Sequence, residues 1–334
     1  MDGEPIDNDM NDRGGHSVAV TAIVVSYFTG PLLTRSLAAL ATAPEIGEII
    51  VVDNGNGPGA VARAVSENEG GAPIRVITGH GNIGFAAACN LGARAAGAAA
   101  FFLFINPDAI MPTGGVKQLI ADGEALARPW MQGAKIIDVD GAEQQGSRRA
   151  TLTPLRAFIE ATKLYKLAPR HPYFRRFNLH QEDCSGEVRA APTISGACFF
   201  LPCEDYDAIG GMDERYFLHV EDIDFCLRFA KAGGRVYFNP RVPVVHYKSS
   251  SRVSPLRVEA RKTASMIRYF GTHFSEPYPA PFLWLVYGAL WLAFGLMATK
   301  RIAAFGVALI GVGARRGSAG LRRVRAMAAR RSSR

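Results

Sequence analysis

The chain has 334 residues, of which 48% are hydrophobic and 20% charged, a balance that is typical of a globular protein and excludes a disordered one. This length is enough for one large domain or two modest ones. The net charge of +8 is concentrated at the C-terminal end, because residues 300–334 contain ten Lys or Arg and no acid. The rest of the chain therefore carries about −2, and the basicity belongs to the tail and not to a face of the main domain.

Neither a disulfide framework nor a secretory signal is expected. The five cysteines are odd in number and form no C-x-x-C pair, which argues against disulfides and a zinc site and favours reduced thiols in the cytosol. Residues 1–16 are acidic and polar, without the basic start and apolar core of a cleaved signal. We expect them to form a disordered leader.

Apolar runs and helical spacings alternate along the first third of the chain. Buried strands are predicted over residues 18–26, 48–53, 74–78 and 100–105, and helices over residues 31–43 and 85–96. Strands that alternate with helices indicate βαβ units. The predicted fold class is therefore α/β, with a mainly parallel central sheet covered by helices on both faces.

The second half of the chain is less regular. Residues 138–192 are polar and irregular, and we interpret them as an insertion that contacts an acceptor. Strand character returns at residues 193–202, and residues 221–232 have the spacing of a helix. Two short strands are predicted over residues 236–238 and 242–246.

A long uncharged run near the C-terminus indicates contact with a membrane. Residues 277–299 contain no charge, and Lys300 and Arg301 precede a second uncharged run, residues 302–314. A membrane span needs roughly 20 apolar residues, so the first run is just long enough, although its three prolines shorten the predicted helix. The basic flank favours anionic lipid headgroups. The alternative is a pair of helices that pack on the main domain.

Polar residues gather where predicted strands end. Asp53 ends one strand, a glycine-rich turn follows Thr78, and Asn106 and Asp108 follow a third strand. Ligands of open parallel sheets bind beyond the carboxyl ends of the strands, so we expect these residues to share one site.

Three carboxylates fall within four residues, at Glu221, Asp222 and Asp224. Crowded carboxylates repel one another and raise at least one pKa, which indicates a cation or a proton-transfer role. Together with Asp108 and a lone histidine, His246, they suggest that a metal and a general base meet at the edge of the sheet.

Several short blocks of the chain form a characteristic series. They are residues 23–27 (IVVSY), 51–54 (VVDN), 82–92 (NIGFAAACNLG), 103–108 (LFINPD), 195–197 (SGA), 210–217 (GGMDERYF), 221–225 (EDIDF) and His246. In this order they resemble the inverting family 2 glycosyltransferases of the GT-A fold, and the rhamnosyltransferase-like branch in particular. The resemblance covers residues 18–275.

The resemblance implies roles for the polar residues on the donor side. Asp53 would contact the pyrimidine base of a nucleotide-diphospho-sugar, and Ser26 and Tyr27 would line the base pocket. Asn82 would lie near the nucleotide or the donor sugar.

The resemblance also implies a divalent cation, Mg²⁺ or Mn²⁺, on the donor diphosphate. Asp108 would hold it, and His246 would be a further ligand. Many relatives carry Asp-x-Asp where this chain has Asn106-Pro107-Asp108. Asn106 would then bind a ribose hydroxyl or a metal-bound water, with a weaker affinity for the metal.

On the acceptor side, the resemblance implies that Asp222 is the catalytic base and that Glu221 orients the acceptor. An acceptor hydroxyl is a poor nucleophile, so a carboxylate must take its proton, which typically contributes about 10²–10⁴-fold to the rate. Asp224 is expected to cap or salt-bridge its helix and not to react. For two other residues a structural role is the alternative: His246 is a satisfied strand-end residue, and Asp53 caps a loop.

We therefore expect a GT-A domain over residues 17–255 and a helical membrane-association region with a basic tail over residues 256–334. The expected reaction is inverting transfer of rhamnose from dTDP-rhamnose to a lipid-linked saccharide in cell-surface polysaccharide synthesis, at the cytoplasmic face of the inner or plasma membrane. Arg261, Lys262 and Arg268 are expected near the phosphate of that acceptor.

Three other classes of protein are alternatives. A non-catalytic nucleotide-sugar-binding scaffold would keep Asp53 and Asp108 without needing Asp222. A NAD(P)-binding oxidoreductase is suggested by G-x-G-x-x-G over residues 79–84, although two strand–helix units precede this turn where a dinucleotide fold would open with it. A nucleic-acid-binding protein would use the arginine tail, but the tail follows the apolar run, which favours lipid and no nucleic-acid partner.

Overall fold

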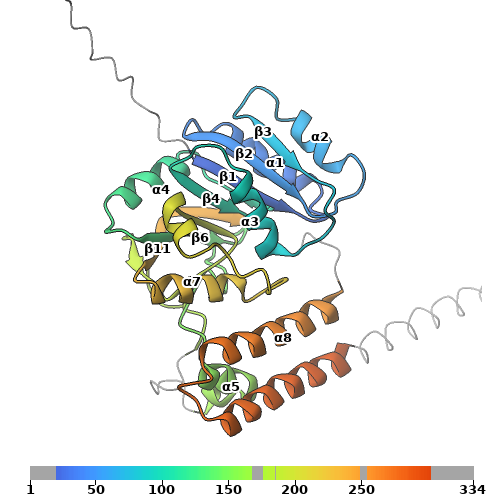
Figure 1. Cartoon of the computed structure of the whole chain (residues 1–334), viewed down its shortest axis with the longest axis vertical. Helices are drawn as coiled ribbons and strands as arrows, with labels where there is room; N and C mark the ends of the chain where they lie inside the picture. Colours follow the sequence, from blue (N-terminus) through green and yellow to red (C-terminus); the bar gives the residue numbers. More distant parts are fainter. Residues whose placement is uncertain (1–19, 168–175, 185, 249–253, 302–334) are drawn as a thin grey trace, which may run out of the picture.

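The computed structural model describes residues 20–167, 176–184, 186–248 and 254–301 (Figure 1). The expected leader, the uncharged run 302–314 and the basic tail beyond it lie outside this described part.

A nine-stranded sheet forms the centre of the protein. Its order is β3 (Ile74–Ile77), β2 (Ile46–Asp53), β1 (Val20–Ser26), β4 (Phe101–Ile105), β10 (Cys198–Pro202), β6 (Trp130–Ile137), β11 (Arg235–His246) and β5 (Ala109–Ile110), with β8 (Arg189–Ala190) beside β11. The first four strands in this order run parallel, as do β6 and β11, whereas β10 is antiparallel to both of its neighbours. The prediction of an α/β fold with a mainly parallel sheet is confirmed.

Helices cover both faces of this sheet (Figure 1). On one face lie α1 (Pro31–Ala41), α2 (Ala60–Ser66) and α4 (Gly115–Glu124); on the other lie α3 (Phe85–Ala95), α6 (Cys203–Ala208) and α7 (Glu221–Lys231). Successive side chains of a strand point to opposite faces, so β1 contributes Val24 to the first core and Ile23 and Val25 to the second.

The range interpreted as an irregular insertion contains regular structure. Helix α5 (Pro154–Thr162) begins after Thr153, whose hydroxyl accepts a hydrogen bond from the backbone N–H of Arg156. Two short strands, β7 (Arg148–Arg149) and β9 (Thr193–Ile194), pair antiparallel and anchor the start and end of the insertion to each other. A 3₁₀ turn, η1 (Leu164–Lys166), follows α5.

Strand β11 is continuous where two short strands were predicted, because its register shifts between Asn239 and Pro243 instead of breaking. The buried side chain of Asn239 accepts the backbone N–H of Arg241 at 2.9 Å and donates to Asp122 at 2.8 Å. This side chain stabilises the irregular segment around Pro240, which has no N–H for the ladder.

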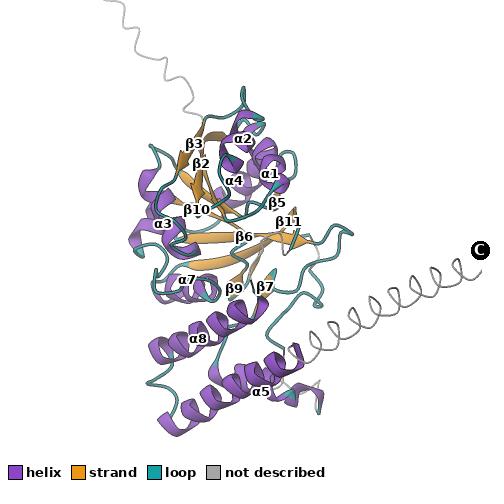
Figure 2. Cartoon of the chain, turned by 90° about the vertical axis from the view of Figure 1, so that its right-hand side faces the viewer, coloured by secondary structure: helices purple, strands orange, loops and turns teal. Residues whose placement is uncertain are grey.

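Two C-terminal helices form a separate layer. Helix α8 (Pro255–His273) and the helix Ala280–Arg301 lie side by side, with α5 against them and away from the central sheet (Figures 1 and 2). Their contacts with α7 form a third hydrophobic core that includes Tyr269, Phe270 and Val286.

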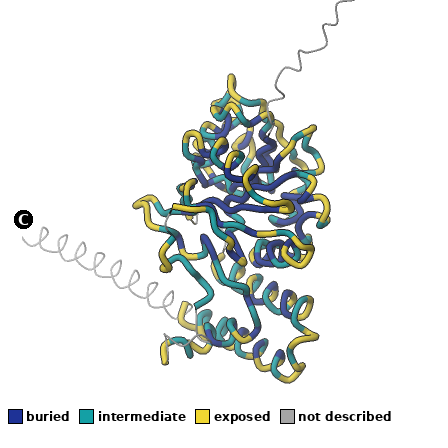
Figure 3. The backbone as a smooth tube through the Cα atoms, turned by 90° about the vertical axis from the view of Figure 1, so that its left-hand side faces the viewer, coloured by how far each residue is buried: buried dark blue, intermediate teal, exposed yellow. Residues whose placement is uncertain are grey.

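Within the described residues, one helix, Ala280–Arg301, is long and apolar enough to cross a membrane by length and composition. Only 17% of its most apolar window is buried. Its exposed apolar residues are Trp284, Leu285, Trp291, Leu292 and Leu296. Figure 3 shows the contrast with the central sheet, whose strands are largely buried.

Candidate active site

The ends of β1 and β2 bring two predicted donor-side residues together. The parallel register pairs Ser26 with Asp53, and Asn56 joins them, since its amide nitrogen donates to the Ser26 carbonyl at 3.0 Å and to Asp53 Oδ1 at 2.7 Å. Burial opposes ionisation of Asp53, but hydrogen bonds from the backbone and side chain of Asn56 and from the backbone of Gly55 outweigh it and lower its pKa. Asp53 therefore fixes the loop after β2, and it is ionised at neutral pH.

The glycine-rich turn before α3 lies against this loop. Asn54 donates to Asn82 Oδ1 at 3.4 Å and to the carbonyl of Gly84 at 3.1 Å, which places the predicted residue Asn82 beside the end of β2. Gly84 has φ of 90°, and a Cβ there would lie 2.6 Å from the carbonyl oxygen of Phe217. A positive φ and a close backbone contact thus explain this glycine without a dinucleotide.

Tyr27 and Phe28 follow β1 at the same edge. Their rings meet edge to face with centroids 4.8 Å apart, and Phe28 is 45% exposed with φ of 50°. A Cβ on Gly55 would lie 3.7 Å from the Tyr27 ring, so the ring packs directly against the loop of Asp53.

Strands β4 and β11 bring together the predicted metal ligands. Asp108 Oδ1 lies 3.2 Å from His246 Nε2, and the amide nitrogen of Asn106 lies 3.3 Å from the same ring nitrogen. The pairing of β5 with β11, which sets His246 opposite Ala109, produces this contact.

Gln144 determines which nitrogen of His246 carries a proton. Its amide nitrogen donates to Asp138 at 2.8 Å and to the His246 carbonyl at 2.6 Å, so its oxygen is the acceptor that faces His246 Nδ1 at 3.0 Å. Nδ1 must then be the donor, which leaves the lone pair of Nε2 directed at Asp108.

The lone pair of Nε2 faces both the Asn106 amide nitrogen at 3.3 Å and Asp108 Oδ1 at 3.2 Å. A carboxylate oxygen and an imidazole nitrogen at this separation are a donor set that could hold a divalent cation, and a hydrogen bond on the far ring nitrogen is the usual support for a metal-binding histidine. Among the described residues, no group of three or more His, Cys, Asp or Glu could hold a metal. In this described part of the chain, the His, Cys, Asp or Glu ligands of a metal here would thus be limited to this pair.

The first turn of α7 carries the predicted catalytic carboxylates. Two residues with left-handed backbones precede it, His219 with φ of 67° and Val220 with φ of 74°. This conformation is strained for a β-branched residue and is typical of functional sites. It places Glu221 and Asp222 at the positive end of the helix dipole.

Three hydrogen-bond donors hold the carboxylate of Asp222. Its Oδ2 accepts from Arg149 at 2.5 Å and from the backbone N–H of Gly196 at 3.0 Å, and its Oδ1 accepts from the backbone N–H of Ile223 at 2.8 Å. Burial disfavours its charge, but the Arg149 guanidinium and the hydrogen bonds outweigh burial and lower its pKa. Asp222 is therefore an ionised carboxylate at neutral pH.

The environment of Glu221 favours the protonated carboxyl group, in contrast to that of Asp222. It is 6% exposed, and its Oε2 has no hydrogen-bond partner among the described residues. Burial, and then the charge of Asp222, raise the pKa of Glu221 to about 8. Adjacent residues therefore present one ionised and one protonated carboxyl group near neutral pH.

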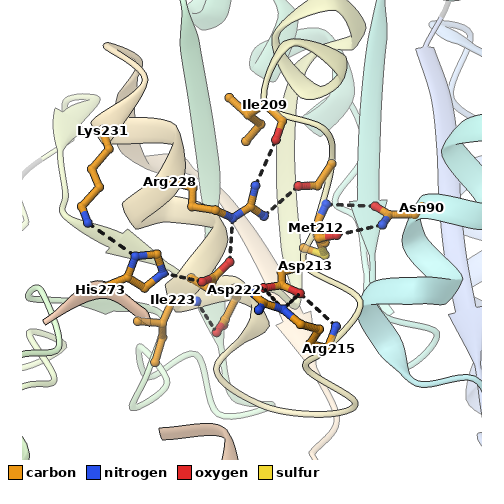
Figure 4. A network of polar contacts seen from close by, with 12 residues as sticks. Asn90, Ile209, Met212, Asp213, Arg215, Asp222, Ile223, Arg228, Lys231 and His273 are labelled. Carbon is orange, nitrogen blue, oxygen red and sulfur yellow. Dashed lines mark hydrogen bonds and ion pairs between the residues drawn. The ribbon is translucent and has the colours of Figure 1, made fainter. Parts of the chain in front are cut away.

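Asp224 has the structural setting that was expected for it. It is fully buried and bonds Arg228 at 2.7 Å and His273 at 2.6 Å, so it ties α7 to α8. Figure 4 shows the surrounding network, in which Arg228 also donates to the carbonyl of Ile209.

The turn before β10 links the region of Asn106 and Asp108 to that of Glu221 and Asp222. The backbone N–H of Asn106 donates to the carbonyl of Ala197 at 2.9 Å, and the neighbouring Gly196 donates to Asp222. A Cβ on Gly196 would lie 3.2 Å from the Cβ of Asp222, so a larger residue would require Asp222 to shift by a few tenths of an ångström.

Sequence reasoning missed four residues of this arrangement: Asn54, Asn56, Gln144 and Arg149. The first two lie in the Asn54–Gly59 loop, where they gave a turn signal only. Gln144 and Arg149 fall in the irregular range, and nothing in their sequence context indicates that they reach His246 and Asp222.

Two family models match this chain. Residues 21–179 match glycosyl transferase family 2, and residues 170–314 match glycosyl transferase family group 2. A curated relative, the N-acetylglucosaminyl-diphospho-decaprenol L-rhamnosyltransferase of Mycobacterium tuberculosis, is 28% identical over 292 residues, which cover 84% of this chain and 93% of the relative.

Two solved structures share the fold. GalNAc-T7 with UDP, GalNAc and Mn²⁺ matches with a TM-score of 0.56 and 15% identity over 78% of this chain and 48% of that one, so the match spans about half of GalNAc-T7. The mannosyltransferase PcManGT from Pyrobaculum calidifontis, in complex with GDP-Man and Mn²⁺, matches with a TM-score of 0.50 and 18% identity, over 88% and 79% of the two chains. At these identities the likeness concerns the fold alone, and the predicted GT-A fold is confirmed.

Proposed function

Because the chain belongs to glycosyl transferase family 2 and is a glycosyltransferase, we propose that it transfers rhamnose from dTDP-rhamnose, with inversion, to a hydroxyl of a lipid-linked saccharide. The M. tuberculosis relative, whose name specifies a rhamnosyl transfer to a diphospho-decaprenol-linked sugar, supports both the donor and the acceptor. The product would serve cell-surface polysaccharide synthesis.

The setting of Asp222 is the observation that carries the proposal. A general base must be ionised before it can accept a proton, and Arg149 with the N–H of Gly196 keep this carboxylate ionised inside a largely buried site. Asp222 takes the proton of the acceptor hydroxyl as that oxygen attacks the anomeric carbon. Glu221, protonated beside it, donates or accepts a hydrogen bond that orients the acceptor.

The donor lies along the ends of β1, β2 and β4. Asp53 contacts the pyrimidine base, Ser26 and Tyr27 line its pocket, and Asn82 lies near the nucleotide or the donor sugar. The loop that joins Ser26 to Asp53 through Asn56 pre-forms this surface. Because these hydrogen bonds are already formed, less conformational entropy is lost when the donor binds.

Asp108 and His246 would hold a divalent cation, Mg²⁺ or Mn²⁺, and Asn106 would bind a ribose hydroxyl or a metal-bound water. The lone pair of His246 Nε2, oriented by Gln144, supports this assignment. A bound cation stabilises the negative charge that develops on the leaving nucleoside diphosphate.

Residues 256–334 would hold the GT-A domain, residues 17–255, on the cytoplasmic face of the inner or plasma membrane. The exposed apolar face of the helix Ala280–Arg301 supports this part of the proposal. Of the three basic residues expected near the acceptor phosphate, Arg261 lies over the Phe217 ring at 3.9 Å and Arg268 is exposed, whereas Lys262 lines the cavity beside Asp222.

A panel of nucleotide-sugars tests this function, with Mg²⁺, with Mn²⁺ and with EDTA. We expect metal-dependent turnover of dTDP-rhamnose, and a loss of about 10²–10⁴-fold in kcat for Asp222→Asn with nucleotide binding retained. Asp207→Asn, an exposed carboxylate on α6, is the matched control and should keep wild-type activity. Full activity in Asp222→Asn would overturn the assignment of the base, and turnover of a different donor would overturn that of rhamnose.

A further inference from the structure

A cavity of about 650 Å³ lies between the GT-A domain and the C-terminal helices. Helix α7 contributes Glu221 and Asp222 to its lining, α8 contributes Lys262 and Met266, and α5 contributes Ala157 and Ala161. Its volume falls in the range of pockets that bury most of a drug-sized ligand. The candidate base therefore faces a pocket of this size, which is partly open to solvent.

Two walls of this cavity differ in chemistry. The wall from α7 and β7 carries ionic and polar groups, among them Asp222, Arg149 and His219. The helix Ala280–Arg301 contributes only apolar residues, at the helical spacing i, i+3, i+4 and i+7: Leu290, Ala293, Phe294 and Met297. A ligand that contacts both walls must be amphiphilic.

The polar wall has unsatisfied hydrogen-bonding groups. Glu221 Oε2 and Arg149 Nε are buried and have no partner among the described residues. Buried polar groups without partners cost about 1–3 kcal/mol each, so they favour a ligand that supplies the missing hydrogen bonds. Sugar hydroxyls both donate and accept and satisfy a protonated carboxyl and a guanidinium alike.

The charges of the cavity argue against a wholly anionic occupant. Its cations are Arg149, which is bound to Asp222, and Lys262, which lies 3.8 Å from Glu259. Glu160 and Glu259 add negative charge to the lining. The anionic part of a ligand is therefore best placed beside Lys262, which is half exposed, with the uncharged sugar deeper, against Glu221 and Asp222.

We propose that this cavity is the acceptor site and that it binds the sugar and the start of the lipid of a prenyl diphosphate-linked saccharide at the same time. The sugar contacts Glu221 and Asp222, the diphosphate lies beside Lys262, and the prenyl chain follows Leu290, Phe294 and Met297. The reaction assigned to this cavity rests on the proposed function, whereas the binding of the lipid-linked saccharide does not. The helix Ala280–Arg301 is then part of the substrate site, and its exposed face is free to contact the membrane.

The test compares apolar residues on two faces of one helix. Phe294→Gln places an amide on the cavity wall, and Leu292→Gln places the same amide on the face where Leu292 is 65% exposed. Ala293→Trp fills the cavity by volume and is a second, independent variant. Both cavity positions are half-buried, so the fold should tolerate them.

Binding is measured without any donor, by native mass spectrometry of the full chain released from detergent micelles. The probes are a synthetic prenyl diphospho-N-acetylglucosamine, the same diphospho-sugar with a short alkyl chain, and a membrane phospholipid. We expect Phe294→Gln and Ala293→Trp to weaken retention of the prenyl probe at least about tenfold, which is the effect of about 1.4 kcal/mol. Leu292→Gln should retain the prenyl probe as wild type does.

Kinetics then separate this inference from the proposed reaction. Phe294→Gln should raise KM for the prenyl acceptor about tenfold while kcat and the KM for the short-chain acceptor stay unchanged. Equal losses in Leu292→Gln and Phe294→Gln, or equal retention of phospholipid and prenyl probe, would overturn the assignment of the cavity. Retention of the prenyl probe without transfer of any sugar would overturn the proposed reaction and leave the site standing.

Discussion

At the edge of the sheet, Asp53 accepts hydrogen bonds from its own loop. At the cavity, by contrast, Glu221 Oε2 has no partner among the described residues, and Asp222 depends on Arg149, 73 positions away in the sequence. The first region is built from short loops whose polar groups satisfy one another. The second is assembled from an insertion, a helix N-terminus and two C-terminal helices. The difference indicates that the proposed donor surface is formed before ligands bind, while the proposed acceptor site would be completed by the acceptor itself.

The proposed metal ligands, Asp108 and His246, lie on the sheet-edge side of this comparison, and substituting one of them should have the largest effect there. We expect His246→Ala to weaken Mn²⁺ binding by about 100-fold and Gln144→Met by about tenfold, because Gln144 acts only by orienting the ring. Electron paramagnetic resonance titration of Mn²⁺ with dTDP present measures both, with Asp207→Asn as the control. Equal affinities in His246→Ala and wild type would remove His246 from the metal site.

On the cavity side, Arg149→Gln should change how activity depends on pH. Arg149 lowers the pKa of Asp222, so its loss lets burial raise that pKa, and a protonated base cannot accept a proton. We expect the acidic limb of kcat/KM to move to higher pH by at least about one unit, so that the fractional loss of activity is largest at the acidic end of the profile and smallest at pH 8. Arg215→Gln, which removes an exposed partner of Asp213, is the control. A loss of equal size at every pH would assign Arg149 a role in folding alone.

The helix Ala280–Arg301 of the C-terminal layer carries five exposed large apolar residues, whereas those at the sheet edge, such as Phe28, stand singly. Trp284→Gln combined with Leu292→Gln should weaken binding to anionic vesicles by about tenfold, since each side chain that enters lipid contributes on the order of 1 kcal/mol or more. Sedimentation with vesicles measures this, and Val139→Gln, at a residue 70% exposed in the GT-A domain, is the control. Unchanged sedimentation would contradict membrane contact through this face.

The last expected effect concerns stability. The unfolded chain releases the Glu221 proton near 4.5, whereas the folded chain holds it to about 8. Between these values the unfolded state binds fewer protons, so the wild type loses stability as pH rises, and the loss is complete above about 8. Glu221→Gln removes this loss.

We expect Glu221→Gln to raise the melting temperature over wild type at pH 8 by several degrees, on the order of 5 °C or more. It should give little difference at pH 5, where Glu221 is protonated in the folded state. Thermal melts at the two pH values measure the effect, and each protein is its own control. The same difference at both pH values would mean that Glu221 is not protonated in the folded state at neutral pH.

The sequence by itself determined the local parts of this protein. Buried strands were predictable because apolar runs such as residues 48–53 can be stable only inside a sheet, and the glycine at Gly84 was predictable as a turn. Asp53, Asn82, Asp108 and Asp222 were identified because they follow strands or begin a helix within short, recognisable blocks. The uncharged run before Lys300 indicated a long apolar helix for the same local reason.

Only the tertiary structure decided which of these residues meet and in what state. His246 reaches Asp108 because β5 pairs antiparallel with β11, and Gln144 then fixes its tautomer. Asp222 is ionised and Glu221 protonated because Arg149 reaches one carboxyl group and not the other. Burial and long-range pairing set these pKa values, and neither is encoded in the spacing of residues along the chain.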